Sequence, residues 1–333
     1  LALFLLLVCV AVHVTESFNR RGQSEPLGRI ALVQPKIAQE IKWDPARVPG
    51  ILDTLRRTTV EAAAGRPGLI LWPEAVTPLA VRGEESARRW VEELVREVGV
   101  PLVLGSVAVE NPGRPQEAWF NGAFVVTPES GLAPSYYAKR RLVPFGEYVP
   151  LGEWLPFMRR FTPYEQGYEC KPGEHWTRFK LTARDGRKFT FGCLICYEDS
   201  DPYLARQYVA SEPVDFLVNI SNDGWFKGTE EHEQHLAICR FRAVEARRAV
   251  VRGVNMGVSG LIDPDGRVTA LPNPEWSKSK KVDAVVTATV PVDARAPLYA
   301  RLGDWVPAGC WLAALLGAGV GRVRRPALGA RAA

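Results

Sequence analysis

Between Gly28 and Pro297 the chain alternates apolar runs rich in Val, Ile and Leu with amphipathic stretches, and this alternation limits the possible folds more than any other feature. Near-continuous apolar runs indicate strands that are buried on both faces. Strands that alternate with helical stretches indicate a layered α/β domain. We expect helices at 46–64, 84–98, 201–211 and 230–248, and strands at 29–34, 68–74, 101–109, 119–127, 189–196, 215–221, 250–263 and 282–290.

Two Asp-Gly turns add hairpins to this pattern. The segments "ARDGRKF" (183–189) and "DPDGRV" (263–268) each place a turn signal beside an expected strand. We therefore expect antiparallel pairs in the sheets as well as parallel ones. No linker within 28–297 is long enough to divide this region, so we expect one domain.

The composition excludes several classes of protein. The 333 residues carry a net charge of only +5, and acidic residues nearly match basic ones along the whole chain. Without a basic patch that carries aromatic residues, nucleic acid is not an expected partner. Six cysteines are too sparse for a disulfide scaffold. We expect no cofactor and no metal, because "HEQH" supplies only His232 and His235, and His235 is expected to make structural hydrogen bonds.

Both ends of the chain are apolar and differ in kind from the middle. We expect residues 1–15 to be the end of a truncated transmembrane helix, followed by a linker at 16–27; the alternative is a signal-peptide region. We expect a C-terminal transmembrane helix at 304–321 and a basic tail at 322–333; the alternative is a buried core helix. A cytoplasmic tail would place the domain on the outer side of the membrane, although two arginines in the linker favour the opposite orientation.

Three reactive residues close apolar runs in different parts of the domain. Glu74 ends "LILWPE", Lys139 ends "PSYYAK" and Cys196 ends "FGCLIC". Each alone has an ordinary explanation: a helix cap, a solvated charge or an unreactive buried thiol. Their comparable positions favour one site, because the carboxyl ends of strands meet at one edge of an open α/β sheet. Cys193 is not expected to pair with Cys196, since residues three apart on a strand face opposite sides.

Glutamate, lysine and cysteine together can carry out acyl transfer. A thiol is mostly protonated at neutral pH and needs a base or a positive neighbour to become a nucleophile. Glu74 could take the proton, and Lys139 could stabilise the thiolate and then the oxyanion of an attacked carbonyl. The backbone N–H after Cys196 could be a second oxyanion donor. The product would be a thioester that an amine or water resolves.

Several motifs together resemble the nitrilase or carbon-nitrogen hydrolase superfamily, and within it the apolipoprotein N-acyltransferase family. They are "WPEA", "YYAKRRLVPFGEYVP", "ICYED", "NISNDGWF" and "HLAICRFRAVEARRAVVRGVNMGVSGLIDPDGRV". The resemblance covers about residues 28 to 305. It implies a nitrilase-like four-layer αββα sandwich flanked by transmembrane helices. Family members carry further membrane helices before this domain, so we expect that the chain is a fragment or that its gene start is placed late.

The resemblance also implies roles for individual residues. Cys196 would be the nucleophile, Glu74 the general base and Lys139 the oxyanion-stabilising cation. Four supporting residues are implied as well: Glu147 and Glu198 would orient the lysine and the thiol, Tyr197 would shape the pocket, and Trp43 of "IKWD" would lie near the active site.

The implied reaction proceeds in two steps at a membrane. An acyl chain would pass from a phospholipid donor to Cys196, and then to the α-amino group of a diacylglyceryl-cysteine lipoprotein acceptor. The implied location is the bacterial inner membrane, with the catalytic domain on the periplasmic side. No cofactor is implied.

An aromatic segment between "PFGE" and the cysteine strand favours a lipid substrate on its own. Aromatic residues beside arginines in a loop suit a membrane interface or a lid over an acyl chain. The alternative is a loop folded back on the core. The residues are Tyr148, Trp154, Phe157, Phe161, Tyr164, Tyr168 and Trp176.

Two other functions remain open. The same triad could hydrolyse small amides, as an amidase or nitrilase does, with water as the acceptor. A membrane protein without activity that binds acylated partners is the third hypothesis, and it requires that Glu74, Lys139 and Cys196 lie far apart.

Overall fold

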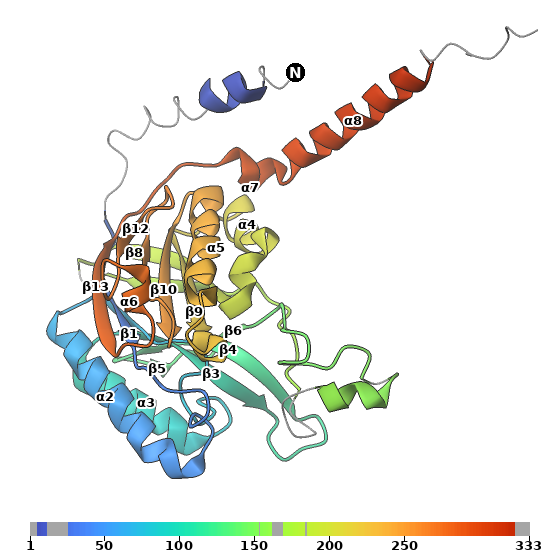
Figure 1. Ribbon diagram of the computed structural model, residues 1–333. Coiled ribbons are helices and arrows are strands. Elements are labelled where there is room, and N and C mark those ends of the chain that lie inside the picture. The colour runs from blue at the N-terminus through green and yellow to red at the C-terminus, as the bar shows by residue number, and fades with distance from the viewer. Residues whose placement is uncertain (1–4, 12–25, 153, 162–168, 184, 324–333) are drawn as a thin grey trace, which may run out of the picture.

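The domain consists of two mixed β-sheets packed face to face, with helices on both outer sides (Figure 1). The computed structural model describes residues 5–11, 26–152, 154–161, 169–183 and 185–323. The first sheet has the order β13-β1-β2-β3-β4-β5, with β6 paired to β4, and the second has the order β12-β11-β10-β9-β8-β7. The four layers match the expected αββα sandwich.

The strands of the first sheet are β1 (Gly28–Gln34), β2 (Leu69–Leu71), β3 (Leu102–Glu110), β4 (Ala118–Thr127), β5 (Gly131–Leu132), β6 (Tyr137–Ala138) and β13 (Ala284–Val290). Those of the second sheet are β7 (Arg178–Thr182), β8 (Lys188–Ile195), β9 (Phe216–Asn222), β10 (Ala249–Asn255), β11 (Gly260–Ile262) and β12 (Val268–Ala270). The α-helices are α2 (Val48–Ala64), α3 (Glu85–Val98), α4 (Pro202–Ala210), α5 (Glu231–Ala246), α6 (Trp276–Ser279), α7 (Leu298–Leu302) and α8 (Trp305–Val323). Short 3₁₀ helices are η1 (Pro45–Arg47), η2 (Pro156–Phe161), η3 (Cys196–Ser200) and η4 (Asp223–Phe226).

Alternation along the strands explains the layers. In β1, Leu32 belongs to the core cluster shared with the second sheet, whereas Val33 belongs to the cluster under α2 and α3. Helices α2 and α3 pack on β1 and β4, and α4 and α5 pack on β8 and β10 (Figure 1). Strands covered on both faces must be apolar on both, which is why these runs are nearly continuous in sequence.

The helices predicted from the sequence correspond to α2, α3, α4 and α5, with bounds that differ by two residues or less. The run at 250–263 is not one strand: it divides into β10 and β11, because Met256 has a φ of 65° and the chain turns there. Both Asp-Gly turns join antiparallel neighbours, β7 with β8 and β11 with β12. Strands β5, β6, β7 and β12 were not predicted; β5 and β6 have only two residues each, and β12 has three.

The apolar C-terminal segment expected at 304–321 forms helix α8, which extends away from the domain (Figure 1). Its large side chains are exposed, with Trp311 at 71% and Leu315 at 66%, so a buried core helix is wrong. At the other end, 5–11 are helical, and the remainder of the expected helix at 1–15 lies outside the described residues. In the parts of the chain that the structure describes, no helix has both the length and the apolarity needed to cross a membrane. Most of the expected linker and basic tail also lie outside those parts.

Candidate active site

Glu74 lies just beyond the end of β2 and is almost completely buried, at 6% exposure. Its backbone rests against Gly105 of β3. A Cβ added at Gly105 would lie 2.5 Å from the Glu74 Cα and 2.5 Å from the Pro73 carbonyl oxygen. Only glycine permits this close approach. The carboxylate is therefore held at a fixed place above the strand ends.

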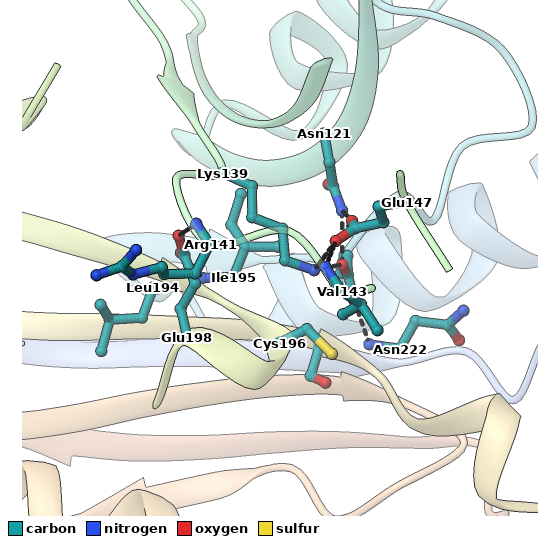
Figure 2. A network of polar contacts seen from close by, with 12 residues as sticks. Asn121, Lys139, Arg141, Val143, Glu147, Leu194, Ile195, Cys196, Glu198 and Asn222 are labelled. Carbon is teal, nitrogen blue, oxygen red and sulfur yellow. Dashed lines mark hydrogen bonds and ion pairs between the residues drawn. The ribbon is translucent and has the colours of Figure 1, made fainter. Parts of the chain in front are cut away.

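Lys139 follows β6 and points into the same space with 1% exposure. Its Nζ donates to Glu74 Oε1 at 3.2 Å and to Glu147 at 3.0 Å (Figure 2). Burial alone would lower the pKa of Lys139, but the charges of Glu74, Glu147 and Cys196 raise it well above its usual range. Lys139 is therefore a permanent cation in the site.

Asn121 joins the two carboxylates, and it was not predicted from the sequence. Its Nδ2 donates to Glu74 Oε1 at 2.6 Å and to Glu147 Oε1 at 2.8 Å. The only signal was a lone amide inside the otherwise apolar strand 119–127. The second oxygen of Glu74 accepts the backbone N–H of Asn222 at 2.9 Å (Figure 2). Three donors thus fix the glutamate, with a β4 amide, a lysine and the end of β9 each supplying one.

Cys196 stands at the first residue after β8, at the start of η3. Its φ is 52°, in the left-handed region that a non-glycine residue adopts at a cost. Figure 2 shows its sulfur on the side where the Lys139 ammonium and Asn222 lie. Burial and the charge of Glu74 raise the pKa of the thiol, whereas Lys139 and the Ser221 hydroxyl oppose the rise. The sulfur therefore needs a proton acceptor to become reactive.

Glu198 forms hydrogen bonds both to the loop that follows Lys139 and to the backbone before Cys196. It is fully buried, and one oxygen accepts the backbone N–H groups of Arg140 and Arg141 at 2.7 and 3.0 Å. Its other oxygen accepts Ile195 N at 2.7 Å, and the Tyr137 hydroxyl donates to both oxygens at 3.0 Å. Burial raises the pKa of Glu198 to about 7 in spite of these donors. The carboxylate thus contacts the backbone just after Lys139 and just before Cys196, and these contacts fix the separation of the two reactive residues.

Tyr197 and Trp43 lie at the surface, at 49% and 44% exposure. The residue that reaches inward from "IKWD" is Lys42, which the sequence analysis did not single out. Its Nζ is 5.2 Å from the centre of a Trp43 ring and 3.5 Å from the Glu74 carbonyl oxygen. Burial lowers the pKa of Lys42 to about 8, although the charges of Glu74 and Cys196 oppose this shift. A second cation thus faces the site.

The aromatic segment divides into two parts. Trp154, Phe157 and Phe161 are exposed at 82%, 56% and 65%, and the last two lie in η2. Trp176 packs on the core, with its ring 5.6 Å from that of Tyr208 and under the Arg140 guanidinium. Tyr164 and Tyr168 lie outside the described residues, and Tyr148 is half-buried.

The two histidines of "HEQH" make hydrogen bonds within the protein. His235 bridges the carboxylates of Asp199 and Asp223, as a structural hydrogen-bonding residue would, while His232 Nε2 accepts the Gly228 N–H at 3.1 Å. Among the described residues no group of three or more His, Cys, Asp or Glu side chains is arranged for a metal ion. Cys193 is buried within β8 and is free, in agreement with the strand alternation.

The geometry suits attack on a carbonyl group. Glu74 can accept a proton, Lys139 stays positive beside it, and Cys196 carries the nucleophile on a strained turn. A thiol, a base and a fixed cation are the parts needed to form a thioester and to stabilise the oxyanion before it.

The sequence profile of the family described as carbon-nitrogen hydrolase matches residues 29–298. Two similar curated proteins are apolipoprotein N-acyltransferases. The one from Geobacter metallireducens is 33% identical over 304 residues, which cover 90% of this chain and 55% of that protein. The one from Chlorobaculum tepidum is also 33% identical, over 86% of this chain and 55% of its own length. The chain therefore spans about half the length of the curated relatives it matches.

Solved structures of lower identity share the fold. A mutant of the amidase from Nesterenkonia sp. AN1, with a covalent acetamide adduct at its active site cysteine, superposes with a TM-score of 0.56 and 17% identity over 80% of this chain and 91% of that one. A CN-hydrolase superfamily protein from Xanthomonas campestris gives a TM-score of 0.55 and 20% identity over the same shares. These likenesses bear on the fold alone.

Proposed function

The chain belongs to the carbon-nitrogen hydrolase family, and we propose that it is the catalytic part of an apolipoprotein N-acyltransferase. Such an enzyme would move an acyl chain from a phospholipid, through a Cys196 thioester, to the α-amino group of a diacylglyceryl-cysteine lipoprotein. The observation that carries this proposal is the 33% identity to proteins of that name across 90% of the chain. The buried ion pair of Lys139 and Glu74 beside a cysteine on a strand end supports it chemically.

The first step loads the enzyme. Glu74 accepts the thiol proton as the Cys196 sulfur attacks the ester carbonyl carbon of the phospholipid. Lys139 and the backbone N–H of Tyr197 would stabilise the oxyanion. When the carbon–oxygen bond breaks, the leaving alkoxide takes the proton back from Glu74, and a lysophospholipid departs. Atoms and charge balance, and no metal or cofactor is needed.

The second step transfers the acyl chain. The neutral amine of the acceptor attacks the thioester carbonyl, and Glu74 accepts an amine proton. The carbon–sulfur bond breaks, the thiolate leaves and regains a proton, and an amide remains on the acceptor. In this step Glu147 and Asn121 would keep Lys139 and Glu74 in place through the hydrogen bonds described above.

The proposed site of action is the outer face of the bacterial cytoplasmic membrane. Trp154, Phe157 and Phe161 would lie at the membrane surface, because large exposed aromatic rings beside Arg159 and Arg160 suit that interface. The exposed apolar face of α8 would lie at the same membrane. Phospholipid donor and lipoprotein acceptor would both reach the site from this side.

An adduct experiment tests the proposal. The protein is incubated with phospholipid vesicles and its intact mass is measured. We expect a mass gain of one acyl chain at Cys196, which is absent in Cys196→Ala and disappears after a diacylglyceryl peptide with a free amine is added. Release of ammonia from small amides without any acyl adduct would establish the amidase alternative instead. A folded protein that gives neither an acyl adduct nor ammonia would contradict the proposal.

A further inference from the structure

A cluster of four charged side chains lies buried behind the cysteine turn. Asp199, Asp223 and Arg252 are fully buried, and His235 is 5% exposed. Arg252 donates to Asp199 Oδ2 at 2.9 Å and to Asp223 Oδ2 at 3.3 Å. The two aspartates come from η3 and η4, and the two cations come from β10 and α5. Such a cluster costs solvation, so its place beside a reactive residue calls for an explanation.

Geometry fixes the protonation of His235. Its Nε2 lies 3.0 Å from Asp199 Oδ1 and its Nδ1 lies 3.1 Å from Asp223 Oδ1. A neutral imidazole has only one N–H, so it would leave one of these carboxylates facing a lone pair. Both nitrogens must therefore carry protons. The carboxylates raise the pKa of His235 to about 9, although burial and Arg252 act against this. With two anions and two cations, the cluster is neutral.

His232, one turn earlier on the same helix, differs in this respect. Its Nε2 accepts the backbone N–H of Gly228 at 3.1 Å and so carries no proton. Burial lowers the pKa of His232. The helix thus presents one charged and one neutral buried histidine, and only the charged one contributes to the balance of the cluster.

Two side chains connect the cluster to the nucleophile. Asn219 accepts a hydrogen bond from Arg252 and donates from Nδ2 to the carbonyl oxygen of Cys196 at 3.4 Å. Ser221 donates to Asp223 Oδ1 at 2.6 Å, and the same hydroxyl acts to lower the pKa of the Cys196 thiol. A hydroxyl has one proton, so Ser221 can donate it either to the carboxylate of Asp223 or to the sulfur of Cys196. A cation beside Asp223 makes its carboxylate a weaker hydrogen-bond acceptor. The hydroxyl of Ser221 is then more available to donate its proton to a Cys196 thiolate.

We propose that the cluster of Asp199, Asp223, His235 and Arg252 is a positioning device for Cys196. It holds the left-handed turn of the cysteine through Asn219, and through Ser221 it presents a neutral environment to the sulfur. This inference rests on the proposed role of Cys196 as nucleophile, and it assigns the four residues no contact with substrate. Other charged groups also face the sulfur from the neighbouring elements, and they stay unchanged in the test: Lys42, Glu74 and Lys139.

The test measures the reactivity of Cys196 without any lipid. In a Cys9→Ser/Cys310→Ser background, which removes the two exposed thiols, the rate of iodoacetamide alkylation at Cys196 is followed by peptide mass spectrometry from pH 6 to 10. His235→Gln leaves the cluster with one negative charge. We expect the pH midpoint of alkylation to rise by about one unit, which lowers the rate at neutral pH roughly tenfold.

Charge rescue separates electrostatics from packing. His235→Gln/Asp223→Asn restores neutrality, and we expect it to recover most of the lost rate although it removes a further native group. His232→Gln is the matched control, because it removes a neutral buried imidazole from the same helix, and it should leave the pH midpoint unchanged. If His235→Gln keeps the wild-type midpoint, or if the double variant is slower than the single one, the cluster serves folding only and the inference fails.

Ser221→Ala covers the case in which the histidine variants do not fold. It leaves all four charges in place and removes the hydroxyl that joins them to the sulfur. A slower alkylation with an upward shift of the midpoint supports the inference, and a wild-type profile contradicts it. Because no acyl donor is used, these results hold whether or not the acyl adduct of the proposed function is found.

Discussion

At the scale of single residues, the ammonium of Lys139 balances the negative charges of two carboxylates, those of Glu74 and Glu147. It lies between Glu74 and Glu147 at 1% exposure. Lys139→Met keeps the length of the side chain but leaves the buried carboxylate of Glu74 facing the partly buried carboxylate of Glu147. We expect a loss of about 3–5 kcal/mol of unfolding free energy in urea titrations, and no acyl adduct. Lys139→Met/Glu147→Gln should regain part of the stability without the activity; a Lys139→Met variant as stable as the wild type would contradict this account.

For Lys42 we expect the opposite effect on stability. This lysine has no carboxylate partner among the hydrogen bonds described, and burial lowers its pKa to about 8. Lys42→Met removes a buried charge, so we expect stability to be kept or increased. Loss of a cation that faces Cys196 should slow thiol alkylation roughly three- to tenfold at neutral pH. An unchanged alkylation rate would show that Lys42 does not act on the sulfur.

Part of the site could be predicted from the residue types at strand ends, and part of it could not. Glu74, Lys139 and Cys196 could be singled out because each closes an apolar run, and Glu147 and Glu198 through family motifs. Asn121 and Lys42 were missed, since an amide within a strand and a lysine in a loop carry no sign of their direction. Their roles depend on which strands become neighbours, and β6 pairs with β4 through only two residues of its own.

At the scale of elements, β3 and the loop after β2 can lie this close together only because Gly105 has no side chain. Gly105→Ala would place a methyl group 2.5 Å from the Glu74 Cα. We expect a loss of about 1–3 kcal/mol and a displaced carboxylate, so acyl-enzyme formation should fall more than stability explains. The control is Gly50→Ala on α2, where the space is open; there we expect a gain of up to about 1 kcal/mol and normal activity. Calorimetry and intact mass measure both effects, and equal behaviour of the two variants would refute the argument.

The η2 segment allows a second prediction at this scale. If Trp154 and the exposed rings of η2 meet a membrane, Trp154→Ala/Phe157→Ala should weaken binding to phospholipid vesicles by roughly tenfold or more, measured by co-sedimentation. Alkylation of Cys196 should not change, because these rings are exposed at 82% and 56% and lie outside the buried site. Val60→Ala is the control, because Val60 is an exposed apolar residue on α2. Undiminished vesicle binding by the double variant would exclude this segment as the membrane contact.

At the scale of the whole molecule, stability should depend on pH through the buried cluster. The pKa of His235 rises from 6.5 to about 9 on folding, so its contribution is complete below about 6.5 and is lost as the pH rises through about 9. The pKa of Asp223 falls from 3.8 to about 2, so its contribution is present above 3.8 and is lost as the pH falls through about 2. The difference in melting temperature between wild type and His235→Gln should therefore shrink from pH 6.5 to 9.5. A constant difference across this range would contradict a charged His235.

The pairing of β1 with β13 has a consequence for synthesis on the ribosome. Gly28 is opposite Val290 in the register, so one edge of β1 stays unpaired until nearly the whole domain has emerged. A nascent chain therefore exposes an apolar strand edge for most of its translation, and a product that stops before Ala284 never covers it. Such early-terminated chains should therefore aggregate or be degraded.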